Sequence, residues 1–445
     1  MQRVESKKKV SMYTIFIPKE DGTYIVTNTL SGAIVHIDDK IYIEELSKIM
    51  QNCDELIYNK NNNMHKHFYD SGLFVDDDVD EYSMVLYHHE RGVVRDNGLR
   101  LTLLTTRQCN FRCSYCYEDF RDDFMTDETY ENILKYLEKS LKDKLHKSVT
   151  ISLFGGEPFL EFNKVLNFLK QAKYVCEKYG IPFTSNATTN FALLTKERFM
   201  ALAEVNCNFY QVTVDGFAKT HDIRRMYRCG SGSFDRIIKN LLDAKQCDYD
   251  FKIAIRTNFD GDVANDIEEF YCYLKENFDD SRFSIIPYPV SKMGGKNDDA
   301  LDVLTRDQSI EVLSVANQIA VKLGINNTIH ETYSSPFSGV CYASKHNNHV
   351  VDCDGTIMKC TLVLDDDFNK VGCLKNDGNI DIDHKKHCKW TNRDSMLGSK
   401  CKSCDILPVC FGKGCPLHVI KGEEHSCDRE LLRYNFINRI KSLVI

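Results

Sequence analysis

The sequence predicts an α/β protein built around a partial (β/α)6, TIM-like barrel. Short runs rich in β-branched and other apolar residues recur along the middle of the chain, and segments with helical periodicity lie between them. This alternation is typical of a parallel sheet, which carries its functional groups at the carboxyl ends of its strands. The six strands are predicted at residues 99–106, 148–154, 183–190, 208–215, 251–258 and 283–288.

The segments on either side of the barrel have different compositions. Before it, three strand-like runs at 12–17, 23–28 and 32–37 precede two helical patterns at 40–50 and 63–74, which indicates a small α/β unit. The acidic run at 76–81 is predicted to be a solvated connector. After the barrel, a helix predicted at 306–324 leads into a segment that we expect to be rich in loops and cysteine and poor in packing.

Composition excludes several classes of protein. The 445 residues contain 57 Lys and Arg against 65 Asp and Glu, and no polybasic block is present to neutralise nucleic-acid phosphates. No apolar run approaches the roughly 20 residues that span a bilayer, and no apolar stretch follows the charged start of the chain. We therefore expect a cytoplasmic protein that binds neither nucleic acid nor membrane.

The chain contains 19 cysteines, which is too many for an ordinary cytosolic enzyme and is better explained by metal than by disulfides. Cys109, Cys113 and Cys116 follow the first barrel strand. Three thiolates can hold a cubane iron–sulfur cluster through three of its irons and leave the fourth iron open. The isolated cysteines are predicted to be small buried apolar residues. They are Cys53, Cys176, Cys207, Cys229, Cys247, Cys272 and Cys388.

The Cys-x3-Cys-x2-Cys spacing, with Tyr115 before the last cysteine, resembles the signature of radical S-adenosylmethionine (SAM) enzymes. The sequence FGGEP at 154–158 ends the second strand, as the glycine-rich motif of that family does. The resemblance implies a SAM molecule whose methionine amino group is received by the glycines and carboxylate of this motif, with ribose and carboxylate contacts on later strands. The implied cofactor-binding residues are Tyr115, Gly155, Gly156, Glu157, Asn190, Thr213 and Arg225. An Asn that caps a turn and an Arg in a surface ion pair are the ordinary alternatives.

The family resemblance also implies a chemistry. An electron from the cluster cleaves SAM reductively, and the resulting 5′-deoxyadenosyl radical removes a hydrogen atom from an unactivated carbon. A flavodoxin or ferredoxin would supply the electron.

The cysteines near the C-terminus resemble the SPASM domain of peptide-modifying radical enzymes, which holds two auxiliary [4Fe-4S] clusters. With the radical cluster, the resemblance implies three [4Fe-4S] clusters in all. By position, one auxiliary cluster would be held by Cys401, Cys404, Cys410 and Cys427, and the other by Cys341, Cys360 and Cys415.

Two departures from the SPASM pattern stand out. Four residues separate Cys410 from Cys415 where the family has three, and Ser335 stands where fuller versions carry a further cysteine. The second auxiliary cluster would then have an open iron or take Cys373 or Cys353 as a ligand. Tetrahedral zinc is the rival for this segment.

The N-terminal unit resembles the winged-helix-like element by which peptide maturases hold the leader of a precursor. A simple extension that covers one end of the barrel is the alternative. The predicted domains are a recognition-like domain at 1–95, the radical SAM barrel at 96–330 and a SPASM domain at 331–445.

The closest resemblance is to maturases of the ranthipeptide and sactipeptide type, which join a Cys sulfur to a carbon of another residue in a precursor peptide. Carbon–carbon crosslinking and epimerisation use the same parts, and for epimerisation Cys229 or Cys272 could donate hydrogen. Anaerobic sulfatase maturases carry an Asp after the second SPASM cysteine, where this chain has Thr361. A non-catalytic iron–sulfur sensor is the remaining alternative.

Overall fold

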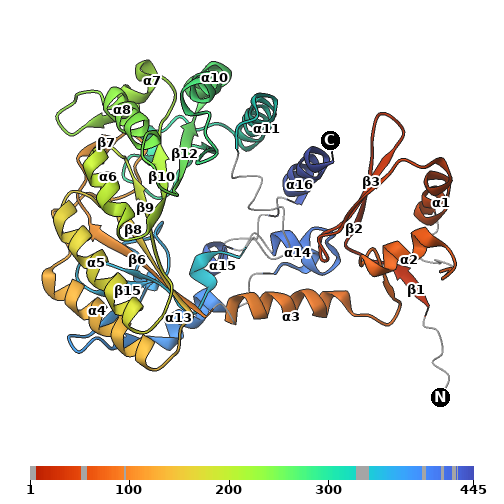
Figure 1. Ribbon diagram of the computed structural model, residues 1–445, viewed down its shortest axis with the longest axis horizontal. Helices are drawn as coiled ribbons and strands as arrows, with labels where there is room; N and C mark the ends of the chain where they lie inside the picture. The colour runs from red at the N-terminus through yellow and green to blue at the C-terminus, as the bar shows by residue number, and fades with distance from the viewer. Residues whose placement is uncertain are drawn as a thin grey trace. The chain divides into compact units, whose positions relative to one another are not determined.

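The computed structural model describes residues 7–51, 58–94, 97–326, 340–392, 397–411, 415–422, 427 and 429–444 (Figure 1). The chain forms two compact units. One consists of Met1–Asp96, His330–His346 and Thr391–Ile445, and the other of Asn97–Ile329 and Asn347–Trp390. The predicted boundaries near 95 and 330 fall outside the described residues, so the three functional domains stay a prediction.

The second unit contains the predicted barrel. Its six parallel strands are hydrogen-bonded in sequence order, which confirms a partial barrel. They are β6 (Gly98–Thr106), β8 (Ser148–Gly155), β9 (Phe183–Thr189), β10 (Cys207–Thr213), β12 (Lys252–Phe259) and β13 (Phe283–Pro289). Each predicted strand is found within a residue or two of its expected bounds.

The sheet continues beyond β6 instead of closing. A strand from the C-terminal part of the chain, β14 (Asn348–Val351), pairs parallel with β6, and three antiparallel strands follow it. Those strands are β15 (Thr356–Met358), β16 (Lys370–Leu374) and β17 (Ile380–Ile382). Val350 and Met358 are buried against Leu104 of β6, so the prediction that this segment is poor in packing was wrong.

Helices connect the strands of the barrel, and their ends are set by local sequence. Thr126 caps the first of them through its side chain, and a capping box at Thr305 begins the last, which ends at the left-handed Gly324. The barrel helices are α4 (Asp127–Lys142), α5 (Phe162–Lys178), α6 (Lys196–Ala203), α7 (Ala218–Arg224), α8 (Phe234–Lys245), α9 (Gly261–Asn265), α10 (Ile267–Phe278) and α11 (Arg306–Leu323). A further helix, α13 (His384–Thr391), follows β17. Figure 1 shows α4, α5 and α6 along one side of the sheet.

The first unit is organised around the three strands predicted near the N-terminus, which form an antiparallel sheet in the order β2-β3-β4. One face packs on α1 and α2, and the other face packs on residues near the C-terminus, including Val409 and Phe436. The elements are β1 (Lys8–Val10), β2 (Thr14–Pro18), β3 (Tyr24–Asn28), β4 (Ile34–Ile37), α1 (Lys40–Gln51), α2 (Asn63–Asp70), β5 (Phe74–Asp76), α3 (Glu81–Val94), α14 (Leu407–Cys410), α15 (Leu417–Ile420) and α16 (Arg429–Leu443).

The acidic run at 76–81 is more than a solvated connector. Glu81 is buried at the start of α3, a helix that was not predicted, and it accepts hydrogen bonds from the Ser11 hydroxyl and, at 3.0 Å, from the Met12 N–H. This carboxylate therefore ties the beginning of the chain to α3. Within the described residues, no helix is long and apolar enough to cross a membrane.

The isolated cysteines differ in exposure. Cys176, Cys207 and Cys247 are buried, as predicted, Cys272 is half-buried, and Cys229 and Cys388 are exposed, so the prediction was wrong for the last two. Cys53 lies outside the described residues.

A buried ion pair joins β6 to the added strands. Arg107, which is 2% exposed, donates from Nε and Nη2 to the Asp352 carboxylate at 2.9 and 2.6 Å. Arg107 follows β6 and Asp352 follows β14, so the pair holds the two loops together. Such a fork-to-carboxylate geometry is strong and directional.

Replacing Asp352 with Ala should lower the free energy of unfolding by about 3 kcal/mol, because it leaves the Arg107 guanidinium buried without its partner. Denaturant unfolding of the variant would measure this change. Glu138→Ala, which removes an exposed ion pair with Lys178, is the control and should have little effect. Equal stability of the two variants would contradict the role given to Arg107.

Candidate functional site

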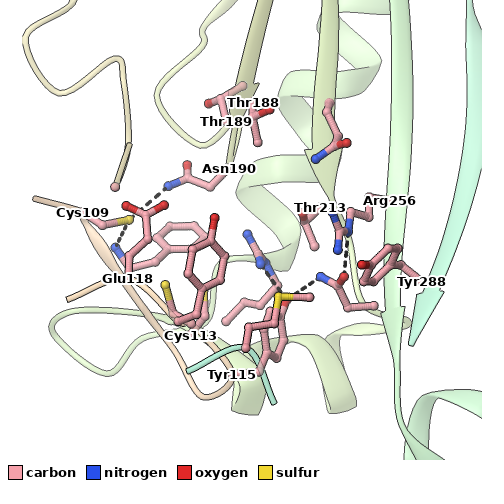
Figure 2. A pocket seen from close by; sticks show the side chains of 18 of the residues that line it. Cys109, Cys113, Tyr115, Glu118, Thr188, Thr189, Asn190, Thr213, Arg256 and Tyr288 are labelled. Atoms are coloured by element: carbon pink, nitrogen blue, oxygen red, sulfur yellow. Dashed lines mark hydrogen bonds between the residues drawn. The ribbon is translucent and has the colours of Figure 1, made fainter. Parts of the chain in front are cut away.

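A cavity opens at the carboxyl ends of the barrel strands (Figure 2). This is where ligands bind in parallel α/β folds, because the connecting loops there can vary without disturbing the sheet. Side chains from four successive strands reach its wall. They include Thr188, Gln211, Thr213, Arg256 and Tyr288.

All three cysteines of the first group line this cavity. They lie on the loop after β6, part of which, β7 (Phe111–Cys113), pairs antiparallel with β11 (Arg225–Tyr227). The Phe111 N–H donates to Cys109 Sγ at 3.3 Å, and the Asn190 amide approaches the same sulfur at 4.0 Å. Hydrogen bonds of this kind adjust the potential of a bound iron–sulfur cluster.

Burial is the main influence on these thiols. It raises the pKa of Cys109 and Cys113, and it raises that of Cys116 to about 12, with the neighbouring Glu118 contributing. At neutral pH the free thiols are therefore protonated. Metal binding would release those protons, because the positive charge of iron stabilises the thiolates.

The donor set fits an iron–sulfur cluster. Thiolates are the ligands that such clusters select, and here three of them surround one cavity. Among the described residues, no three His, Cys, Asp or Glu side chains are grouped to bind a single metal ion. A cubane does not require that grouping, since each of its cysteines binds a different iron.

The two glycines of the FGGEP segment hold the cysteine loop in place. Gly155 has φ of 107°, and a Cβ on it would overlap the carbonyl oxygen of Thr106, while a Cβ on Gly156 would overlap that of Gln108. The Gly156 N–H donates to Thr106 O at 3.1 Å, which fastens the loop to the end of β8. Both glycines also line the cavity, so their backbone is open to a ligand on the other side.

Glu157 lies behind the cavity wall. Its carboxylate accepts from the Thr189 hydroxyl at 2.8 Å, from the Asn190 N–H at 2.8 Å and from the Phe159 N–H at 3.2 Å. Burial raises the pKa of Glu157 to about 7, although these hydrogen bonds favour the charged form. The side chain therefore fixes the end of β9, and its predicted contact with the amino group of SAM stays a prediction.

The other residues predicted to contact SAM all line the cavity: Tyr115, Asn190, Thr213 and Arg225. The sequence did not indicate how they are connected. The Tyr115 hydroxyl donates to Asp215 and accepts from Arg225 Nη1 at 2.7 Å and from Asn258 Nδ2 at 3.0 Å. Burial raises the pKa of both Tyr115 and Asp215, and Arg225 counteracts it for each group.

The cavity residues that the sequence analysis missed include Gln211, Arg256, Asn258 and Tyr288. Each lies on a strand whose carboxyl end was predicted to face the site. Their positions could have identified them, because polar side chains near the carboxyl ends of parallel strands lie at the edge of the sheet where the site was expected.

The C-terminal cysteines fall in both compact units. In the first unit, burial raises the pKa of Cys401, with the neighbouring Cys427 contributing, and it raises that of Cys404, with Cys401 contributing. Cys341, Cys410 and Cys415 belong to the same unit.

In the barrel unit, Cys360 Sγ accepts from the Leu362 N–H at 3.4 Å. The Cys353 thiol donates to the Leu104 carbonyl oxygen at 3.1 Å, so it is engaged inside the sheet. Cys373 is half-buried on β16. Ser335 lies outside the described residues.

Residues 103–274 match the family model of the radical SAM superfamily. This match spans the cysteine loop, the glycine motif and five of the six barrel strands. The chain therefore contains a radical SAM domain. A domain of this family implies SAM and a [4Fe-4S] cluster.

The chain is similar to curated enzymes whose names describe different activities. It is 25% identical over 342 residues to a serine-type anaerobic sulfatase-maturating enzyme of Bacteroides thetaiotaomicron, covering 69% of this chain and 80% of that protein. It is 23% identical over 266 residues to the radical SAM cyclopropyl synthase TigE of Paramaledivibacter caminithermalis. That match covers 53% of this chain and about half, 54%, of TigE.

Solved structures share the fold. A structure of anSMEcpe with bound AdoMet has a TM-score of 0.60 at 18% identity and covers 78% of this chain and 96% of that one. Streptococcus suis SuiB bound to its precursor peptide SuiA has a TM-score of 0.52 at 18% identity, covering 93% of this chain and 97% of that one.

Replacing Gly156 with Ala should displace the cysteine loop, because the added Cβ meets backbone atoms that cannot move independently. We expect about four fewer irons per chain than in the wild type after anaerobic reconstitution, measured as iron and acid-labile sulfide. Gly261→Ala, where the nearest atom to the new Cβ is 4.0 Å away, is the control. Iron content equal to that of the control would show that the loop does not need this contact.

Proposed function

We propose that this protein cleaves SAM reductively and modifies a ribosomally made precursor peptide, most simply by joining a Cys sulfur to a carbon of another residue. The observation that carries the proposal is the placement of Cys109, Cys113 and Cys116 around one cavity at the end of a radical SAM barrel. When bound, the cluster and SAM supply the electron and the 5′-deoxyadenosyl radical that removes a hydrogen atom. The barrel orients the reactants and excludes water.

Different residues of the chain would bind different parts of SAM. The backbone of Gly155 and Gly156 would lie against the methionine part, since no side chain stands between them and the cavity. Thr213 and Asn190 would donate to the ribose or carboxylate. Arg225, fixed by the Tyr115 hydroxyl, would place positive charge beside Cys113.

We further propose that the C-terminal cysteines hold two auxiliary [4Fe-4S] clusters. The mutual influence of Cys401, Cys404 and Cys427 supports a thiolate group in the first unit. Forming a thioether removes two hydrogens and is an oxidation, so an electron must leave the product, and iron–sulfur clusters are suited to accept it. About 12 irons per chain with little zinc would fit three clusters, whereas about four irons with stoichiometric zinc would fit the zinc alternative.

The first unit supports a peptide substrate. Within the described residues β4 pairs only with β3, so its outer edge is available for an added strand. Ile34 on β4 is 37% exposed and Ile41 at the start of α1 is 75% exposed. Exposed apolar side chains beside a free strand edge are suited to contact an apolar leader segment. Similarity to SuiB, a protein solved with its precursor peptide, extends over this unit as well as the barrel.

Sulfatase maturation is the second candidate, because the relative from Bacteroides thetaiotaomicron matches over two thirds of this chain. In that role this chain would take a polypeptide into the cavity that the cysteine loop lines. Thr361 stands where that group has an acid to act as the base, which favours the precursor-peptide proposal.

The function can be tested with the reconstituted enzyme, SAM, a reductant and a short Cys-containing peptide encoded beside the gene. A thioether product has lost two hydrogen atoms and one alkylatable thiol, whereas a carbon–carbon crosslink keeps the thiol. Epimerisation incorporates solvent deuterium without loss of mass. Mass spectrometry separates these outcomes, and an unchanged peptide accompanied by modification of a sulfatase peptide would reverse the order of the two candidates.

Replacing Ile34 and Ile41 together with Asp should weaken binding of that peptide by about tenfold or more, because charge would replace apolar contact beside the strand edge. SAM cleavage without peptide should be unchanged. Leu145→Asp, an equally exposed apolar position in the other unit, is the control. Fluorescence anisotropy of the labelled peptide measures the affinity, and equal values for the two variants would place the leader elsewhere.

A further inference from the structure

Arg256 reaches the cavity from β12, away from Cys109 and Cys113 (Figure 2). Its Nε donates to Asn258 Oδ1 at 2.8 Å, and its guanidinium lies over the Tyr288 ring, 3.8 Å from the ring centroid. In the described part of the chain, Nη1 and Nη2 donate to no protein group. The guanidinium is therefore oriented by two neighbours while its outer edge faces the cavity.

Arg256 has fewer acidic neighbours than Arg107, Arg224 and Arg225. Arg224 pairs with Asp260 at 3.0 Å, and Arg107 pairs with Asp352. Arg225 lies beside Asp215 and Cys113. Among the described residues, no carboxylate lies within 4.0 Å of Arg256, although the side chain is half-buried. A desolvated cation without an anionic partner is unfavourable, so an anion in the cavity would stabilise it.

The position of Arg256 depends on the same network that fixes the cysteine loop. Asn258 donates from Nδ2 to the Tyr115 hydroxyl at 3.0 Å and from its backbone N–H to Asp215 at 2.8 Å. These bonds turn Asn258 Oδ1 toward Arg256, so the guanidinium is positioned before any ligand arrives. A planar guanidinium held in this way is suited to bidentate binding of a carboxylate.

We propose that Arg256, Asn258 and Tyr288 form a carboxylate-binding subsite in this cavity. The inference rests on the proposed function, because that function brings two carboxylates to the cavity: the one on the methionine part of SAM and an Asp or Glu side chain of the peptide. Either one would be held by the two terminal amino groups of Arg256, whose guanidinium lies over the Tyr288 ring. Neither SAM nor an unmodified peptide carries a phosphate, which is the other anion that this geometry suits.

The first arm of the test uses the reconstituted full-length protein and measures the affinity of SAM and of decarboxylated SAM by equilibrium dialysis. If the carboxylate belongs to SAM, Arg256→Gln weakens SAM binding about tenfold or more and leaves decarboxylated SAM unchanged. Arg236→Gln, which removes an exposed charge from α8 outside the cavity, is the control and changes neither.

The second arm uses the SAM-loaded protein and two small probes, N-acetylglutamate α-amide and N-acetylglutamine α-amide, in saturation-transfer NMR. If the carboxylate belongs to the peptide, the wild type binds the acid, the Arg256→Gln variant loses that signal, and SAM affinity is unchanged. The amide probe, which has the same shape without the charge, binds weakly to both proteins.

Equal affinities of wild type and Arg256→Gln for SAM and for the acidic probe would overturn the subsite. If Arg256→Gln does not take up iron, Arg256→Lys replaces it. A point charge cannot make two parallel bonds, so a loss of about threefold or more in one arm is expected, and no loss in either arm overturns the proposal. Both arms measure binding, so they are distinguishable from a failure of the proposed peptide chemistry.

Discussion

The contact between the cysteine loop and the end of β8 is the constraint on which the rest of the site depends. The carbonyl oxygens of Thr106 and Gln108 occupy the space that Cβ atoms on Gly155 and Gly156 would need. The backbone of the cysteine loop packs directly on the backbone of the glycine motif. The loop can therefore adopt only one position, which fixes its three thiols around the cavity. Residues 103–274 match the radical SAM superfamily, and under the proposed function this loop would present its three thiols to one cluster.

Charge is the second organising element. The Tyr115 hydroxyl joins Asp215, Arg225 and Asn258 in one buried network, so the residue before the last loop cysteine is tied to the ends of β10 and β12. Buried polar groups are stable only when their partners are in place, and here each member supplies a partner to another. The network therefore links the cysteine loop to Arg256 on the other side of the cavity and fixes the orientation of the side chains between them.

Much of the fold was predictable, because the barrel strands and the three N-terminal strands are apolar runs bounded by turns. The added strands after residue 347 were missed, since each is only three to five residues long, and Val350 of β14 and Met358 of β15 are buried by packing with Leu104 of β6. In the site, spacing singled out cysteines and glycines that line the cavity, and their ligand roles stay a prediction. It did not reveal the Arg107–Asp352 pair, whose members are 245 residues apart, or that Glu157 turns away from the cavity.

The most direct test of the central claim is release of 5′-deoxyadenosine from SAM by the anaerobically reconstituted, reduced protein. We expect the wild type and Cys388→Ala, which alters an exposed cysteine outside the loop, to release it. Cys113→Ala should release none, because the cluster would keep only two of its three protein ligands. Equal release by Cys113→Ala and the wild type would contradict the assignment of the cysteine loop as the radical centre.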